Sequence, residues 1–464
     1  MPLKRPVWRC EHLGMKILWL CNMMMPMIAE RLGLEASNKE GWLSGLARVT
    51  LDRGHENEIE LAVAFPGPEK LFPPGENFCM HTLTIRGREL KCFGFREDVT
   101  RPEIYDQGLE ESLKWIIDFW KPDMVHCFGT EYPHTLAMCR IFPDKDKLLI
   151  SLQGLCAVYA ECYFADLPEK VIRSATLRDR LKRDSLREQQ QKFVMRGEME
   201  IQAVKLAGNI AGRTAWDHFY TKEWNPGARY FCMNETLRES FYGAVWDRKN
   251  CIPHSIFLSQ GDYPIKGLHY MLKALPGILE AFPDTKVYVA GNSIIDYRTL
   301  KQKLKISGYG RYLRKLIREN GLRDAVVMLG RLEEGQMRER YLKSHLFVCC
   351  SSIENSPNSL GEAMLLGMPC VSADVGGIPS IFTGGEDGIL YEGFRKGLNN
   401  DSDFASVSEK LAKSVVEIWR NEEKLEMYAK NARKHAEKTH DPALNYKIMT
   451  EIYAKIVGQS LTVN

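Results

Sequence analysis

Residues 351–370 read SSIENSPNSLGEAMLLGMPC, a polar turn that runs into an apolar helix. The apolar run HLFVCC at 345–350 directly precedes the turn and is typical of a buried strand. Ser356 is a favourable N-cap and Pro357 a favourable first helical residue, so we expect the helix to begin there. A buried strand that passes through a short polar turn into a helix is the unit from which parallel α/β sheets are built.

The same alternation of strand and helix patterns extends along both halves of the chain. Before about residue 152, the runs MKILWL, IELAVAF, DMVHCF and KLLISL alternate with amphipathic stretches. From about residue 250, CIPHSIFL, KVYVAG, AVVMLG and PCVSA follow the same order. Alternation of this kind implies right-handed crossovers and parallel sheets. We therefore expect an α/β protein with two Rossmann-like, doubly wound domains that face each other across a cleft.

The length of 464 residues allows two or three domains with full cores. We expect an N-terminal domain over 1–235 and a C-terminal domain over 236–439. A final helix over 440–464 is expected to pack back on the N-terminal domain. The N-terminal domain carries a basic helical insertion at about 165–200, which is either a solvated helical pair that packs lightly or a surface for an anionic membrane or an acceptor.

Composition excludes several other classes of protein. A formal net charge of +3 gives no support for a nucleic-acid partner. The 13 cysteines contain no C-x-x-C pair, which favours buried thiols in a reducing cytosol over disulfides or a zinc site. No stretch approaches the ~20 apolar residues of a membrane-spanning helix. We expect a cytoplasmic protein that has at most a peripheral contact with a membrane.

Two glutamates flank the start of the helix at the opening stretch. The first N–H groups of a helix lack an internal acceptor, so we expect Asn358, Ser359 and Leu360 to offer amides to an anion such as a diphosphate. Glu354 lies in the turn, where its carboxylate can face the cleft. Glu362 lies inside the helix, where it can accept hydrogen bonds from the vicinal hydroxyls of a ribose. Alternatively, Glu362 is an acid that only favours the helix dipole.

These residues carry a resemblance to a known family. The spacing of Glu354 and Glu362, the run EAMLLGMPCVSADVGGIP and the segment IKGLHYMLKAL resemble the E-x7-E signature and flanking motifs of retaining glycosyltransferase family 4. Members of that family have the GT-B architecture of two Rossmann domains. The resemblance is strong over about 250–400 and loose over the first domain. It implies that the first domain binds the acceptor and the second binds the nucleotide-sugar donor.

The resemblance also implies a role for each matching residue. Glu362 would bind the ribose and Glu354 would lie against the donor sugar, while the amides of Asn358 and Ser359 hold the diphosphate. Lys266 would neutralise the diphosphate as it leaves. The remaining donor-side positions are the glycines of the GGIP run, which let the backbone approach the ligand closely; they are Gly376 and Gly377.

This sequence departs from the family pattern at three places. The Arg usually found five residues before the lysine is Gly261 here, and Arg213 is our candidate substitute. Pro357 lacks an N–H where the family usually has a small glycine. Gln153 stands where many members have a catalytic His, and Gln carries no proton at a useful pH.

The strand end in DMVHCFGTEY offers further candidates. His126 could act in the cleft, although a His at a strand end is also commonly structural. Thr130 and Glu131 follow the same strand, and we place them on the acceptor side.

The resemblance therefore implies a retaining transferase that needs no metal or other cofactor. It would move a sugar from a nucleotide-diphosphate donor, expected to be UDP-linked, to a saccharide or lipid-linked acceptor. The basic insertion suggests surface polysaccharide assembly at the cytoplasmic face of a membrane, with a possible peripheral contact to anionic lipid. Two alternatives stay open: a nucleotide-sugar 2-epimerase, which would need its own acid/base set, and a non-catalytic subunit that binds nucleotide sugar.

Overall fold

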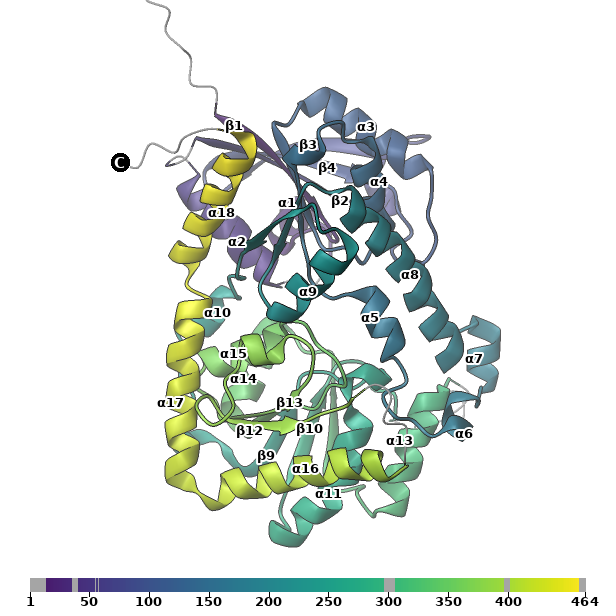
Figure 1. The fold of residues 1–464 in the computed structure, drawn as a ribbon, viewed down its shortest axis with the longest axis vertical. Helices are drawn as coiled ribbons and strands as arrows, with labels where there is room; N and C mark the ends of the chain where they lie inside the picture. Colours follow the sequence, from purple (N-terminus) through teal and green to yellow (C-terminus); the bar gives the residue numbers. More distant parts are fainter. Residues whose placement is uncertain are drawn as a thin grey trace, which may run out of the picture.

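The computed structural model describes residues 14–35, 41–54, 56, 58–295, 305–395 and 401–458, with the backbone alone for 401–406. Two α/β units lie one above the other in Figure 1, the N-terminal unit in purple to teal and the second in green. Each unit consists of a sheet covered by helices. The predicted fold class, two Rossmann-like domains, is confirmed.

The first sheet has eight strands in the order β3-β4-β2-β1-β5-β6-β7-β8. Every neighbouring pair is parallel except β3 and β4. Side chains of β1 and β5 are buried on both faces, as their continuous apolar runs predict. The strands are β1 (Met15–Cys21), β2 (Ile59–Pro66), β3 (Phe78–Ile85), β4 (Arg88–Phe95), β5 (Met124–Phe128), β6 (Leu148–Ser151), β7 (Asn209–Gly212) and β8 (Arg229–Cys232).

The second sheet has six parallel strands in the order β11-β10-β9-β12-β13-β14. Strand β9 enters its centre first, and the chain adds neighbours on one side and then on the other. The carboxyl ends of β9 and β12 therefore meet where the order reverses, which is the ligand-binding edge of such sheets. The strands are β9 (Ile252–Leu258), β10 (Lys286–Ala290), β11 (Val326–Gly330), β12 (Ser344–Cys349), β13 (Cys370–Asp374) and β14 (Ile389–Glu392).

Helices follow most strands and cover both faces of each sheet. The first unit contains α1 (Pro26–Arg31), α2 (Gly41–Arg53), α3 (Gly108–Trp120), α4 (Pro133–Ile141), α5 (Cys156–Glu161), α6 (Glu169–Ile172), α7 (Leu177–Lys182), α8 (Leu186–Leu206) and α9 (Ala215–Trp224). The second contains α10 (Glu239–Tyr242), whose Phe241 lies in its core, and α11 (Leu268–Ala281), α13 (Gly308–Glu319), α14 (Glu334–Lys343), α15 (Asn358–Leu365), α16 (Asp401–Arg420) and α17 (Glu422–Thr439). No helix of the described residues is long and apolar enough to cross a membrane.

The last helix, α18 (Pro442–Val457), returns to the first unit. In Figure 1 the yellow helices α17 and α18 run up one side of the molecule, from the second unit to the first. Tyr446, Met449 and Tyr453 of α18 are buried in the core that surrounds β1. The Trp19 indole donates to the Tyr453 hydroxyl at 2.9 Å. A single helix thus links the end of the chain to its first strand.

The basic insertion also connects the two units. We call residues 162–186 the strap, and its buried side chains, among them Leu167 and Ile172, belong to the core of the second unit. The hydroxyl of Thr176 donates to the carbonyl of Ile306 at 2.8 Å. The strap therefore does more than pack lightly as a solvated pair, because its apolar side chains find a partner in the other unit.

Candidate functional site

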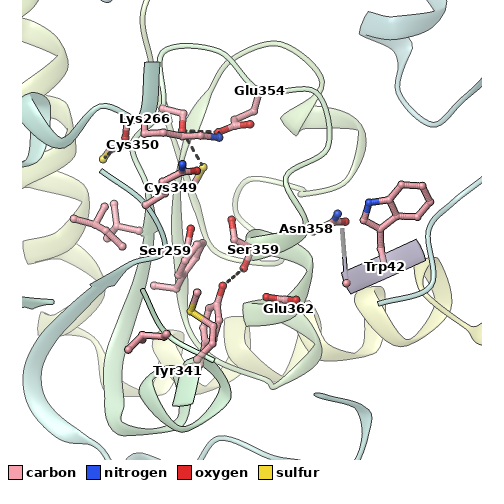
Figure 2. A pocket seen from close by; sticks show the side chains of 18 of the residues that line it. Trp42, Ser259, Lys266, Tyr341, Cys349, Cys350, Glu354, Asn358, Ser359 and Glu362 are labelled. Atoms are coloured by element: carbon pink, nitrogen blue, oxygen red, sulfur yellow. Dashed lines mark hydrogen bonds and ion pairs between the residues drawn. The ribbon is translucent and has the colours of Figure 1, made fainter. Parts of the chain in front are cut away.

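A cavity of about 430 Å³ lies between the two units, at the carboxyl ends of β9 and β12 and the start of α15. Seven of the residues selected from the sequence line it: Glu131, Gln153, Lys266, Glu354, Asn358, Ser359 and Glu362. In Figure 2, Lys266 and Glu354 lie at one end of the pocket and Glu362 lies at the other, with Asn358 and Ser359 between them. The first unit closes the pocket with Trp42 of α2, whose indole lies close to Asn358 in the same view.

Lys266 and Glu354 form a buried ion pair. The Lys266 Nζ lies 2.6 Å from Oε1 of Glu354, and the same oxygen accepts from the Ser351 hydroxyl at 2.7 Å. Burial opposes the charged form of Lys266, but the Glu354 carboxylate, together with Tyr263 and Tyr159, outweighs it and raises the pKa of Lys266 well above its usual range. The site therefore holds a permanent cation beside a carboxylate at the carboxyl end of β12.

Glu362 is paired with an arginine that the sequence did not reveal. Arg238 donates from Nε to one carboxylate oxygen at 2.7 Å and from Nη2 to the other at 2.6 Å. Both side chains are largely buried, with 12% and 7% of their surface exposed. Burial raises the pKa of Glu362, and Arg238 opposes that shift. Each carboxylate oxygen has a second lone pair, so a ribose hydroxyl can still bind beside Arg238.

The helix at the opening stretch begins one residue later than predicted. Its first residue is Asn358, and Pro357 takes the N-cap position with extended backbone and no side-chain cap. Pro357 can hold this place because φ of −69° suits both the turn and its ring. The amide of Leu360 already donates to the Pro357 carbonyl at 2.9 Å. Of the three amides expected to bind an anion, Leu360 is therefore engaged, and those of Asn358 and Ser359 are the ones without an acceptor inside the helix.

Gly376 and Gly377 do not line the cavity but contact the backbone of Glu354, which does. Gly376 has φ of +54°, and a Cβ there would lie 2.0 Å from the carbonyl oxygen of Glu354. The amide of Gly377 donates to that carbonyl at 2.9 Å. The two glycines thus fix the backbone that carries the Glu354 carboxylate.

Arg213 is not among the residues that line the cavity. Its guanidinium pairs with Glu235 at 2.9 Å and donates to the Gln153 side chain at 3.3 Å. Glu235 is fully buried, and this burial raises the pKa of its carboxyl although Arg213 opposes the shift. The structure therefore gives Arg213 a local partner and does not bring it to the pocket as the substitute for Gly261.

His126 and Thr130 are also held away from the cavity. The His126 ring lies within hydrogen-bond distance of the Tyr453 hydroxyl, at 2.6 Å, and of the Ser151 hydroxyl, at 2.7 Å. Burial lowers the pKa of His126 to about 3, so the ring is neutral at physiological pH. The Thr130 hydroxyl donates to Glu200 at 2.6 Å. Both side chains have the contacts of structural residues.

Asn355 joins the two units directly beside the site. Its amide nitrogen donates to the Gln153 carbonyl at 2.9 Å and to the Asp217 carboxylate at 3.1 Å, and its oxygen accepts from Thr214 at 2.6 Å. A sequence signal existed, because Asn355 lies in the polar turn between the two glutamates. Arg238 and Trp42 gave no such signal, since neither belongs to a strand end or a recognisable motif.

Comparison with known families locates the strongest sequence similarity in the second unit. Residues 254–435 match the family model of glycosyl transferases group 1. The spore coat protein SA of Bacillus subtilis is 25% identical over 174 residues, which are 37% of this chain and 41% of that protein. The phosphatidyl-myo-inositol mannosyltransferase of Mycobacterium leprae is 26% identical over 175 residues, 37% of this chain and 39% of that protein. The matched region thus spans about two fifths of the length of these relatives.

Solved structures resemble the chain over nearly its whole length. A sucrose-phosphate synthase from Thermosynechococcus elongatus has a TM-score of 0.63 at 14% identity and covers 96% of this chain and 100% of its own. The Anabaena protein HepE, solved in complex with UDP and glucose, has a TM-score of 0.61 at 14% identity, with 95% and 100% covered. The chain therefore has the two-domain GT-B fold of glycosyltransferases, and its second domain matches glycosyl transferases group 1 in sequence.

Proposed function

We propose that this chain is a retaining glycosyltransferase of family 4 that moves a sugar from a UDP-sugar to a saccharide or lipid-linked acceptor. One observation carries the proposal. A buried lysine–carboxylate pair, two amides at a helix start and a second carboxylate line one cavity between the two domains. These groups match the sugar, the diphosphate and the ribose of a nucleotide sugar, in the order in which those parts are joined.

The chemistry of the leaving group explains the cation. When the bond between sugar and diphosphate breaks, negative charge gathers on the diphosphate oxygens. Lys266 and the amides of Asn358 and Ser359 would stabilise that charge, with the positive end of the α15 dipole behind them. Because the protein supplies these donors itself, we propose that transfer does not need a metal ion.

Retention of configuration follows if the acceptor attacks from the face that the diphosphate leaves. The departing phosphate oxygen can then take the proton of the acceptor hydroxyl, so a protein base is not required. This accounts for Gln153 in the cavity lining and for the neutral, enclosed His126. Glu354 would orient the donor sugar and offset positive charge that develops on it.

The comparisons favour this donor and acceptor. HepE was solved with UDP and glucose, and the Mycobacterium leprae relative is named a mannosyltransferase of phosphatidyl-myo-inositol. These descriptions support UDP as the nucleotide and a lipid-linked or surface saccharide as the acceptor. The enzyme would then serve surface polysaccharide assembly at the cytoplasmic face of the membrane.

The test combines a donor screen with one substitution. A nucleotide sugar at 100 times its Kd should raise the free energy of unfolding by about 2.7 kcal/mol, so a thermal-shift screen of UDP-, GDP- and ADP-sugars identifies the donor. Glu354→Gln keeps an acceptor for Lys266 and Ser351 but removes the charge. We expect it to abolish acceptor-dependent UDP release and to leave UDP binding intact. Full activity of this variant would contradict the site assignment.

The same assay separates the alternatives. Epimerisation of the donor sugar without any acceptor would identify a 2-epimerase. Tight UDP binding by the unmodified protein, without UDP release in the presence of any acceptor, would identify a non-catalytic binding subunit.

A further inference from the structure

A second, larger groove lies on the side of the molecule away from α17 and α18. It has a volume of about 1850 Å³ and is formed by the strap, α13 and β11. The three helices α6, α7 and α13 gather at this side in Figure 1. The strap and α13 are in direct contact, because the amide of Gly308 at the start of α13 donates to Asp179 of α7 at 2.8 Å. The groove and α7 therefore form one continuous surface.

Among the described residues that line the groove, every charged one is a cation. These cations are Lys170, Arg311, Arg314, Lys315, Arg318 and Arg323. Lys315 pairs with Glu319 at 3.8 Å, and within the described ranges no other member of this set forms an ion pair with a carboxylate. In a chain with a net charge of only +3, the described part of this face thus carries five cations that pair with no described carboxylate, which favours an anionic partner.

The groove also has apolar walls. Val326, Val327 and Met328 lie on β11, which is an edge strand of the second sheet, and all three are only partly buried. Ile317 of α13 adds to the same lining. A purely polar polyanion makes no favourable contact with these apolar side chains. An anionic lipid has phosphates that can bind the cations and acyl chains that can contact the apolar walls.

Helix α7 presents two leucines to solvent beside the groove. Leu177 is 61% exposed and Leu181 is 77% exposed. They are four residues apart and so share one face of the helix. Asp179 lies midway between them and is only 1% exposed because it binds the start of α13, so the leucine face points away from the protein. The cations Arg180, Lys182 and Arg183 flank the leucines and are exposed.

We propose that α7, the strap and the α13 groove form a docking surface for an anionic phospholipid bilayer. Leu177 and Leu181 insert among the acyl chains while the groove cations bind headgroup phosphates. Arg178 does not take part, because it pairs with Asp179 and Asp184. The surface draws on both domains, since the strap is bound to α13, and it lies apart from the cavity of the proposed transfer site.

Vesicle sedimentation tests the proposal without any measurement of transfer. The intact protein should sediment with vesicles of phosphatidylglycerol and phosphatidylcholine in equal parts, and not with phosphatidylcholine alone, and added salt should release it. Arg314→Gln combined with Arg318→Gln should weaken binding by about fivefold for each charge removed. Leu177→Ser combined with Leu181→Ser should weaken binding by at least tenfold, since two apolar side chains no longer enter the bilayer.

Matched controls exist on the opposite side of the molecule. Lys430 and Lys434 are exposed on α17, and Leu444 of α18 is 47% exposed. Lys430→Gln with Lys434→Gln removes the same charge, and Leu444→Ser removes a comparable side chain, so neither should change binding. Absence of sedimentation with the anionic vesicles, or equal losses in the control variants, overturns the proposal. Binding to dextran sulfate but not to vesicles also overturns it, in favour of a polyanion, and loss of self-association in the leucine variant points to a second copy of the chain instead.

Discussion

Replacement of Arg238 by methionine tests the electrostatics of the proposed ribose site. Arg238→Met keeps much of the side-chain volume but removes both hydrogen bonds to Glu362, which measure 2.7 and 2.6 Å. The Glu362 side chain is only 7% exposed, so water from the cavity replaces the lost donors incompletely. Removal of one partner from a buried pair of this kind costs about 3–5 kcal/mol, because the other charge stays buried without compensation.

The cost should depend on pH in a defined direction. Burial already raises the pKa of Glu362, and the variant loses the arginine that opposes the shift. A carboxyl with a raised pKa in the folded state binds more protons folded than unfolded, so its free energy of unfolding falls as pH rises. We therefore expect Arg238→Met to lose more stability at about pH 8 than at about pH 5, where Glu362 can be protonated.

Urea unfolding, monitored by tryptophan fluorescence at each pH, measures the loss in free energy of unfolding and its dependence on pH. Arg238→Lys keeps the charge but not the paired geometry, and should lose less than the methionine variant. The control is Arg248→Met, which removes a surface arginine paired with Glu422 and Glu426 and should change the free energy of unfolding far less, because water solvates both partners. The reasoning is refuted if Arg238→Met costs no more than Arg248→Met, or if its cost is the same at both pH values.

Three further predictions follow from other contacts. Lys266→Met removes the cation that would face the diphosphate, so calorimetry should show UDP affinity reduced by about 10- to 100-fold with uridine affinity little changed; equal losses for both ligands would contradict that placement. Glu235→Gln leaves the Arg213 guanidinium buried without a counter-charge and should lower the free energy of unfolding by about 3–5 kcal/mol in urea titrations, whereas a loss below about 1 kcal/mol would show that the pair is not needed. Burial lowers the pKa of His126 to about 3, so as the pH drops below about 6.5 the unfolded state binds a proton that the folded state does not, and the free energy of unfolding should fall. His126→Gln should reduce the slope of this acid destabilisation by up to about 1.4 kcal/mol per pH unit. An unchanged slope would show that His126 does not cause the destabilisation.

The candidate site could be predicted in part because its residues follow strand ends. Lys266 and Glu354 come from the segments that follow β9 and β12, and Glu362 lies in the helix that begins just after Glu354. The carboxyl ends of parallel strands meet at one edge of a sheet, so these residues lie close together. The position of His126 near a strand end did not predict where its side chain lies. Side chains alternate between the two faces of a strand, so position near a strand end does not say which face a residue occupies. Tyr453, which is far away in the chain, lies against it.

The pairs that hold the site together could not be derived from local pattern. Arg238 and Glu362 come from a connection without regular structure and from a helix more than a hundred residues later. Nothing near Arg238 marks it as a ligand, and its partner depends on how the connecting segment crosses the second domain. Arg213 with Glu235 and Asn355 with Asp217 are similar cases, since each needs the position of elements that are separate in sequence.

The sequence by itself determined the two largely parallel sheets, the helix at the proposed phosphate site, and the lysine and two glutamates around it. Those features depend on local periodicity, on capping and on the common direction of parallel strands. Only the tertiary structure decided that Arg238 binds Glu362, that His126 is enclosed, and that the basic insertion straps one domain to the other. The physical reason is that the partner of a buried charge or of an apolar face is set by which surfaces meet when the domains pack, and that choice is not written in any single stretch of the chain.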